Sequence, residues 1–196
     1  TTSGSTTPIL PPPAAADPID LEVSHGAEWV AAAAGPMLQR IPGACVVFAY
    51  RHKSPLAAER AQSLQRQLPN ESVRFIAEVP DMHALVAEAS CVVFPVDELY
   101  GKVDIPIVLL EAMQLRTPVV SLDSGPLADL QGVQRVSPGD IGSLVDLATR
   151  TILDASFRAA CVAAQHDAIE RKHRPAHAAK RYESIYDNLL TAVPNA

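Results

Sequence analysis

A glutamate inside an apolar stretch is the first residue with a candidate chemical role. Glu111 stands in the sequence VLLEAM, between Leu109 and Leu110 on one side and Ala112 and Met113 on the other. A carboxylate in such surroundings needs hydrogen-bond donors, and the vicinal hydroxyls of a ribose would supply two of them. The other interpretation is an ordinary exposed glutamate on a helix. The spacing alone leaves both interpretations open.

The start of the same helix is a candidate site for an anion. The helix begins at Ile105-Pro106, so the amides of Ile107 and Val108 have no partner inside it and would point out of its end. Such amides could hold a diphosphate without a glycine-rich loop, and Lys102 stands nearby in the sequence. The sequence contains neither GxxxxGKS/T nor GxGxxG after a strand. These absences disfavour a nucleoside triphosphatase and a dinucleotide-dependent oxidoreductase.

Alternating strands and helices would position these residues. The predicted strands cover residues 45–50, 73–79, 91–95, 118–122 and 132–136, with a further short strand near 20–23. The predicted helices cover residues 28–39, 55–68, 82–89, 107–115, 140–153, 156–173 and 175–191, with a helical turn at 127–130. Short apolar strands between helices are typical of a parallel sheet covered on both faces. The sequence therefore predicts an α/β fold with a doubly wound, Rossmann-like parallel sheet.

The last predicted helix has an apolar side of its own. Tyr182, Ile185, Tyr186 and Leu189 recur along one side of it at helical spacing. We expect this side to pack back on the sheet or on a neighbouring domain.

Composition and charge limit the classes of partner. The length of 196 residues favours one domain, and the net charge of −6 argues against a nucleic-acid backbone as the main partner. The three cysteines, Cys45, Cys91 and Cys161, are expected to be buried, reduced thiols, which favours a cytoplasmic protein. No apolar run approaches the ~20 residues of a membrane-spanning helix. Residues 1–19 are expected to form a flexible linker or arm, and residues 20–192 the folded domain.

The segment from Val73 to Asp140 resembles the C-terminal domain of retaining glycosyltransferases of family four, which have the GT-B fold. The pieces that carry the resemblance are, in order, VRFIAEV, ASCVVFP, LEAM, LRTPVV, SGPLADL and VSPGD. A weaker similarity extends from about Glu28 to Leu190. The resemblance implies that the chain is one half of a GT-B architecture, the half that binds the nucleotide sugar.

The resemblance also implies roles for individual residues. Glu111 matches the glutamate that binds the ribose hydroxyls in this family. The amides of Ile107 and Val108 match the backbone that approaches the diphosphate. Residues 77–79 match the loop beside the base, which makes Glu78 and Val79 candidate contacts.

Cations and a catalytic carboxylate are harder to place. Arg51 and Lys53 follow a predicted strand and are candidate cations for the leaving diphosphate, although a solvated basic loop fits them equally well. The spacing of the family's paired glutamates would put the first of them at Val103. Asp104 is one residue away, and together with Lys102 it is the candidate replacement in catalysis. The alternative is an impaired site.

A further departure lies near the N-terminus. The family usually has a basic element ending in Lys-Gly for the phosphates, and here His25-Gly26 stands in its place. His25 is therefore a candidate phosphate ligand, although a lone histidine in a loop is more often structural or merely exposed.

The resemblance implies a hexosyltransferase that moves a sugar from a UDP-, GDP- or ADP-linked donor to an acceptor hydroxyl with retention. We expect no cofactor and no metal. The expected partners are an acceptor glycan, lipid or small molecule and an N-terminal GT-B domain in the same or another chain, because complete enzymes of this type have two similar domains. Such an enzyme would serve polysaccharide or glycoconjugate biosynthesis in the cytoplasm, with membrane association through its other parts.

Two alternatives remain. The chain could be a non-catalytic nucleotide-sugar-binding or interaction module derived from such an enzyme, or a GT-B-like nucleotide-sugar epimerase. A chain that begins with Thr1 also suggests a processed product or a piece of a longer protein.

Overall fold

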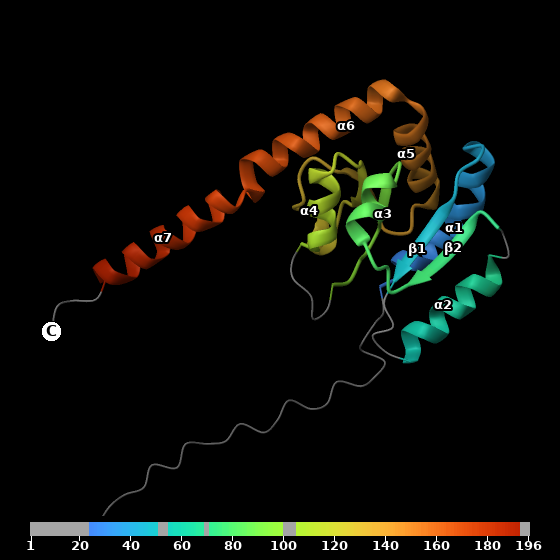
Figure 1. The fold of residues 1–196 in the computed structure, drawn as a ribbon, viewed down its shortest axis with the longest axis horizontal. Coiled ribbons are helices and arrows are strands. Elements are labelled where there is room, and N and C mark those ends of the chain that lie inside the picture. The colour runs from blue at the N-terminus through green and yellow to red at the C-terminus, as the bar shows by residue number, and fades with distance from the viewer. Residues whose placement is uncertain (1–23, 51–54, 69–70, 100–104, 193–196) are drawn as a thin grey trace, which may run out of the picture.

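Helices and strands alternate along most of the chain (Figure 1). The computed structural model describes residues 24–50, 55–68, 71–99 and 105–192. The elements are α1 (Gly26–Arg40), β1 (Val46–Tyr50), α2 (Pro55–Gln67), β2 (Val73–Ala77), α3 (Met82–Glu88), β3 (Val92–Phe94), α4 (Ile107–Gln114), β4 (Val119–Leu122), η1 (Gly125–Leu127), β5 (Gln134–Val136), α5 (Ile141–Leu153), α6 (Ala155–Ala168), η2 (Ile169–His173) and α7 (Pro175–Ala192). The predicted arm at 1–19 and the predicted strand at 20–23 lie outside the described residues.

Aspartates fix the start of three helices. The side chains of Asp81, Asp140 and Asp154 each accept a hydrogen bond of 2.9 Å from a backbone amide in the first turn of α3, α5 and α6, respectively. A carboxylate in this position satisfies an amide that the helix itself leaves unpaired. These local signals explain why sequence patterns located the helices well.

In the part of the chain that the structure describes, all strand pairs are parallel and they form two sheets. β1 pairs with β2, with Val46 opposite Val73, while β3, β4 and β5 pair in that order. Parallel strands joined by helices confirm the predicted fold class, an α/β Rossmann-like arrangement. The sequence predicted a single sheet, whereas the described strands form two. No strand pairing among the described residues joins the β1–β2 sheet to the β3–β4–β5 sheet.

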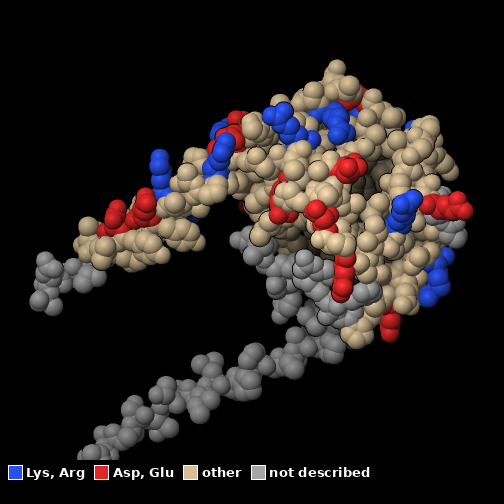
Figure 2. Space-filling view, in the orientation of Figure 1, with Lys and Arg blue, Asp and Glu red and all other residues tan. Residues whose placement is uncertain are grey.

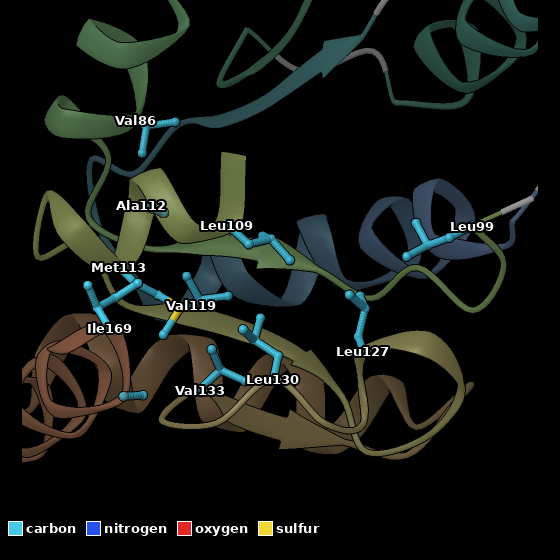
Figure 3. Packing of buried hydrophobic residues seen from close by; sticks show 11 residues of the cluster. Val86, Leu99, Leu109, Ala112, Met113, Val119, Leu127, Leu130, Val133 and Ile169 are labelled. Atoms are coloured by element: carbon cyan, nitrogen blue, oxygen red, sulfur yellow. The ribbon is translucent and has the colours of Figure 1, made fainter. Parts of the chain in front are cut away.

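The side chains of β4 divide the core into two clusters. Val119 points to one face and packs with Leu109 and Met113 of α4 (Figure 3). Val120 and Leu122 point to the opposite face, where they pack with residues of α1 and α5. Successive residues of a strand point to opposite faces, so β4 is covered by helices on both sides, as a doubly wound sheet requires.

Helix α7 runs away from the body of the molecule (Figure 1). Tyr182, Ile185, Tyr186 and Leu189 are exposed, so the prediction that this side packs back on the sheet is wrong. The physical reason lies just before α7. The chain makes a π-helical turn at η2 and then an extended residue, Arg174, which redirect the last helix. Packing of α7 on a neighbouring domain stays a prediction.

The cysteines occupy three different environments. Cys161 is buried and Cys91 is half-buried, and burial raises the pKa of the Cys91 thiol to about 12. Cys45 is exposed, so its predicted burial is wrong, because it precedes β1 at the edge of the fold. All three are free thiols.

Candidate functional site

Helix α4 presents Glu111 to the outside while it anchors in the core. Leu109, Ala112 and Met113 are fully buried, whereas the side chain of Glu111 is 36% exposed. Three of the four apolar neighbours of Glu111 in the sequence are therefore buried in the core, whereas Leu110 lines the same pocket as its carboxylate. Glu111 borders solvent, and His83 is the cationic candidate that lies near it among the described residues.

An open pocket of about 210 Å³ lies at this carboxylate. Three elements line it: His83 from α3, the residues Leu110, Glu111 and Gln114 from α4, and Ile169 and His173 from η2. The His83 Nδ1 atom lies 3.7 Å from Glu111 Oε1, which is near enough for electrostatic attraction but too long for a hydrogen bond. Polar groups around an apolar floor suit a small polyhydroxylated group.

His173 reaches this pocket from an unusual turn. It is the last residue of the π-helix η2, a geometry that is rare and often occurs at functional sites. Burial, helped by the charge of Lys172, lowers the pKa of His173 below its usual value. His173 therefore gains its proton at a lower pH than an ordinary histidine.

The start of α4 has two amides available to an anion. Pro106 precedes the helix without a side-chain cap, and Leu109 N–H donates to Pro106 O over 3.0 Å. No described group accepts a hydrogen bond from the amides of Ile107 and Val108. The exposed side chain of Ile107 shows that this end of the helix is open. Such amides could hold an anion, and the anion site stays a prediction.

Glu78 occupies a strained position at the end of β2. Its φ of 54° lies in the left-handed region, which costs a residue with a side chain about 1–2 kcal/mol. Its amide donates to Tyr50 O over 3.2 Å and so joins the ends of β1 and β2. Backbone strain of this kind gathers at binding sites. Neither Glu78 nor Val79 lines the pocket at Glu111, and their role beside the base stays a prediction.

The first turn of α1 packs against the end of β3. A Cβ atom on Gly26 would lie 2.7 Å from Pro95 O, so only glycine permits this approach. Asp97 receives hydrogen bonds from Ser24 Oγ at 2.6 Å and from the His25 amide at 2.9 Å, and its second oxygen lies 2.9 Å from His25 Nδ1. Asp97 thus serves as an external cap for α1.

These contacts also set the charge of Asp97. Burial by itself raises the pKa of Asp97, but the hydrogen bonds from Ser24 and His25 outweigh burial, so the pKa lies below its ordinary value. Asp97 is therefore a carboxylate at neutral pH. It pairs with the residue that was a candidate phosphate ligand, and its charge opposes an anion at the start of α1.

The structure places only part of the predicted site. Arg51, Lys53, Lys102 and Asp104 lie outside the described residues, and so does Val103. Acidic side chains lie over the middle of the face shown in Figure 2.

Sequence reasoning did not find His83, Gln114 and His173. His83 follows β2 by a short loop, and loops at the carboxyl ends of strands were the expected place for ligand contacts. That signal could have drawn attention to His83. Gln114 was also within reach, because it lies one turn beyond Glu111 on α4. His173 is distant in sequence, so only packing brings it to Glu111.

The part of the chain that the structure describes contains neither a candidate metal site nor a candidate membrane-spanning helix. No group of three or more His, Cys, Asp or Glu residues there could hold a metal ion. None of the helices there combines the length and the apolar character needed to cross a bilayer.

The fold of the chain can be compared with those of solved structures. Parallel strands with helices on both faces match the Rossmann-like domains of GT-B glycosyltransferases. The C-terminal domain of the glycosyl transferase group 1 family protein LpcC from Francisella tularensis matches with a TM-score of 0.65 at 18% identity, over 78% of this chain and 81% of that one. Identities this low show the fold alone.

Longer glycosyltransferase chains share the same fold. HepE (Alr3699) from Anabaena, solved with UDP and glucose, matches with a TM-score of 0.69 at 18% identity, over 87% of this chain and 46% of that one. TarM from S. aureus matches with a TM-score of 0.64 at 14% identity, over 86% of this chain and 32% of that one. The chain thus spans less than half the length of either protein.

The family follows from the sequence match. The family model described as glycosyl transferases group 1 matches residues 20–154, which is more than half of the 196-residue chain. The chain therefore belongs to the glycosyl transferases group 1 family. No curated protein matches the chain significantly.

Proposed function

We propose that this chain is the nucleotide-sugar-binding half of a retaining glycosyltransferase of family four. The observation that carries the proposal is the position of Glu111, whose carboxylate borders an open pocket while its helix is anchored in the core. A solvent-accessible carboxylate on a rigid helix can accept hydrogen bonds from both vicinal hydroxyls of a ribose. Membership of the family supports this role, as does the likeness of fold to HepE, which was solved with UDP and glucose.

The proposed reaction moves a sugar between two oxygens. The bond between the anomeric carbon and the donor's phosphate oxygen breaks, and its electron pair leaves with the nucleoside diphosphate. The acceptor oxygen bonds to the same face of that carbon, and its proton passes to the leaving diphosphate. Because negative charge grows on the diphosphate, the amides of Ile107 and Val108 at the start of α4 would stabilise it.

The remaining predicted residues would complete this site. Arg51 and Lys53 would add positive charge near the diphosphate. Lys102 and Asp104 would act at the reacting centre, and Glu78 and Val79 would contact the base through their backbone. We propose a UDP-, GDP- or ADP-linked donor and no other cofactor.

The complete reaction would need more than this chain. We propose that an N-terminal GT-B domain, in the same or another chain, holds the acceptor glycan, lipid or small molecule. The assembled enzyme would work in the cytoplasm, in polysaccharide or glycoconjugate biosynthesis. Residues 1–196 alone are expected to bind nucleotide weakly and to transfer no sugar.

Calorimetric titration of the purified chain with UDP, GDP and ADP tests the donor site. We expect one of the three to bind saturably, and Glu111→Ala to weaken that binding by at least about tenfold, because hydrogen bonds to a charged group contribute about 1.5–3 kcal/mol each. Glu88→Ala is the matched control, since Glu88 is exposed at the far end of α3. It should leave the affinity unchanged.

Two results would contradict the proposal. If no nucleotide binds, the proposal that the pocket is a donor site is contradicted. If the wild type and Glu111→Ala bind nucleotide equally well, the proposed role of Glu111 is contradicted. Efficient sugar transfer by residues 1–196 alone would show instead that no second domain is needed.

One observation favours the alternative of a non-catalytic module. Asp97 holds His25 and places a negative charge at the start of α1, where the family usually has a Lys-Gly element. A module retained for interaction would tolerate this change. It predicts that Glu111→Ala leaves the activity of an associated enzyme intact, which an assay of the assembled enzyme would show.

A further inference from the structure

Thr117 lies where the three elements that line the candidate ribose pocket are joined. The pocket contains His83 from α3, Glu111 from α4 and Ile169 from η2. Thr117 comes shortly after α4 and is 2% exposed. Its amide donates to Ala112 O over 2.9 Å, a hydrogen bond of the kind that closes a Schellman motif. The backbone of Thr117 therefore fixes the end of the helix that carries Glu111.

The Thr117 hydroxyl joins α4 to α3. Its Oγ1 atom donates to Val86 O over 2.9 Å. Among the seven residues of α3, all of which the structure describes, only Val86 is buried. Because so little apolar surface holds α3, this hydrogen bond has a large share in fixing the helix beside α4. The position of His83 in the pocket depends on it in turn.

Gln165 joins Thr117 to α6, the helix that continues into η2. Its Nε2 atom donates to Thr117 O over 3.3 Å, and Gln165 is fully buried. Its Oε1 atom has no hydrogen-bond partner among the described residues. A buried amide with one unsatisfied atom adds little to stability, so its value lies in where it holds the chain. Ile169 lines the pocket one helical turn after Gln165.

We propose that Thr117 and Gln165 form a buried polar clamp that positions the walls of the pocket for nucleotide binding. Neither residue lines the pocket, so both are positioning residues that act through the elements they join. Val86 of α3, Met113 of α4 and Ile169 of η2 belong to the same core cluster (Figure 3). A shift at the clamp therefore reaches all three walls. The inference rests on the proposed function of the pocket as the ribose site.

Nucleotide titration of two variants at Thr117 tests the clamp. The probe is whichever of UDP, GDP and ADP binds the wild type most tightly. Thr117→Val keeps the shape of the side chain but removes the hydroxyl, so it should weaken binding about three- to tenfold, the effect of one neutral hydrogen bond. Thr117→Ser keeps the hydroxyl and should bind about as tightly as the wild type.

Thr151→Val is the matched control. Thr151 is fully buried on α5, its hydroxyl has no hydrogen-bond partner among the described residues, and it does not line the pocket. The substitution should leave the affinity unchanged. Titrations well below the melting temperature of each variant separate affinity from stability, because every molecule is then folded and the measured affinity reports the geometry of the site.

The outcomes separate the clamp from the proposed function. Wild-type affinity in Thr117→Val, together with weaker binding by Glu111→Ala, would overturn the clamp and leave the donor site in place. Binding of no nucleotide by the wild type would overturn both. If Thr117→Val does not melt cooperatively, Gln165→Met removes the other hydrogen bond of the clamp and should weaken binding in the same way.

Hydrogen exchange of the α3 amides gives a readout that needs no ligand. These amides should exchange faster in Thr117→Val than in the wild type, because α3 loses its hydrogen bond to Thr117. Thr151→Val should leave their exchange unchanged. Equal exchange in the wild type and Thr117→Val would show that the hydroxyl does not hold α3, and the clamp would be overturned.

Discussion

The two sheets differ in how deeply their strands are buried. All residues of β4 are buried, whereas no residue of β1 or β2 is. Around β4, helices cover both faces and form the two core clusters. The pocket at Glu111 belongs to this well-packed part, because α4 is anchored beside β4. Its geometry is therefore held by the core, as a site that positions a ligand requires.

The β1–β2 sheet is held by different contacts. Phe48 and Phe75 lie opposite each other on the two strands, and their rings stack with centroids 4.5 Å apart. Glu78 then ends this sheet in a strained conformation. The comparison shows that the candidate ribose contact stands on the rigid part of the molecule, while the candidate base loop stands on the less buried part.

The largest expected effect is the loss of stability when a buried leucine beside β4 is replaced, compared with the replacement of a phenylalanine in β2. Leu109→Ala should lower the free energy of unfolding by about 2–5 kcal/mol, because it empties a fully buried site in the cluster around β4. Phe75→Ala should lower it by less than about 2 kcal/mol, because Phe75 is only half-buried. Urea denaturation followed by circular dichroism measures both. An equal loss would show that the two sheets contribute equally to stability.

A smaller effect on stability is expected at two residues with left-handed backbone conformation, one after α4 and one after β2. Arg116 has a φ of 62° just after α4, and Glu78 has a φ of 54° just after β2. Replacing either by glycine removes steric strain but adds freedom to the unfolded chain. We therefore expect Arg116→Gly and Glu78→Gly each to raise the free energy of unfolding by about 0.5–1 kcal/mol. The matched control is Arg74→Gly, which removes a side chain from an exposed position inside β2 and should destabilise the protein.

The smallest expected effect is the pH dependence of the contact between α1 and β3. The pKa of Asp97 in the folded protein lies below its value near 3.8 in the unfolded chain. The stabilisation by Asp97 is therefore present above pH 3.8 and is lost as the pH falls through the pKa of the folded protein. Asp97→Asn should therefore cost less than about 1 kcal/mol at pH 7, since the side chain is partly exposed. The difference from the wild type should shrink as the pH falls from about 5 to below 3. Thermal melts across that range measure it, and a constant difference would show that the charge of Asp97 has no part in stability.

Sequence patterns alone determined the order and type of the elements. The run VVSL is β4, the run VVF is β3, and the aspartates at 81, 140 and 154 cap helices close to their predicted starts. These features depend on neighbours within a few residues, since strand alternation and helix capping are local. The same local string carried the resemblance that identified Glu111 and the start of α4 as candidate contacts.

The surroundings of these residues were decided only by the tertiary structure. His83 and His173 come from two other elements, and only the packing of α3 and η2 against α4 brings them to Glu111. The same holds for the cap that Asp97 provides to α1, more than seventy residues away in the chain. The direction of α7 also follows from a turn geometry at η2 that no local pattern predicts. A linear sequence specifies hydrogen bonds between near neighbours, whereas contacts between distant residues depend on how the whole core packs.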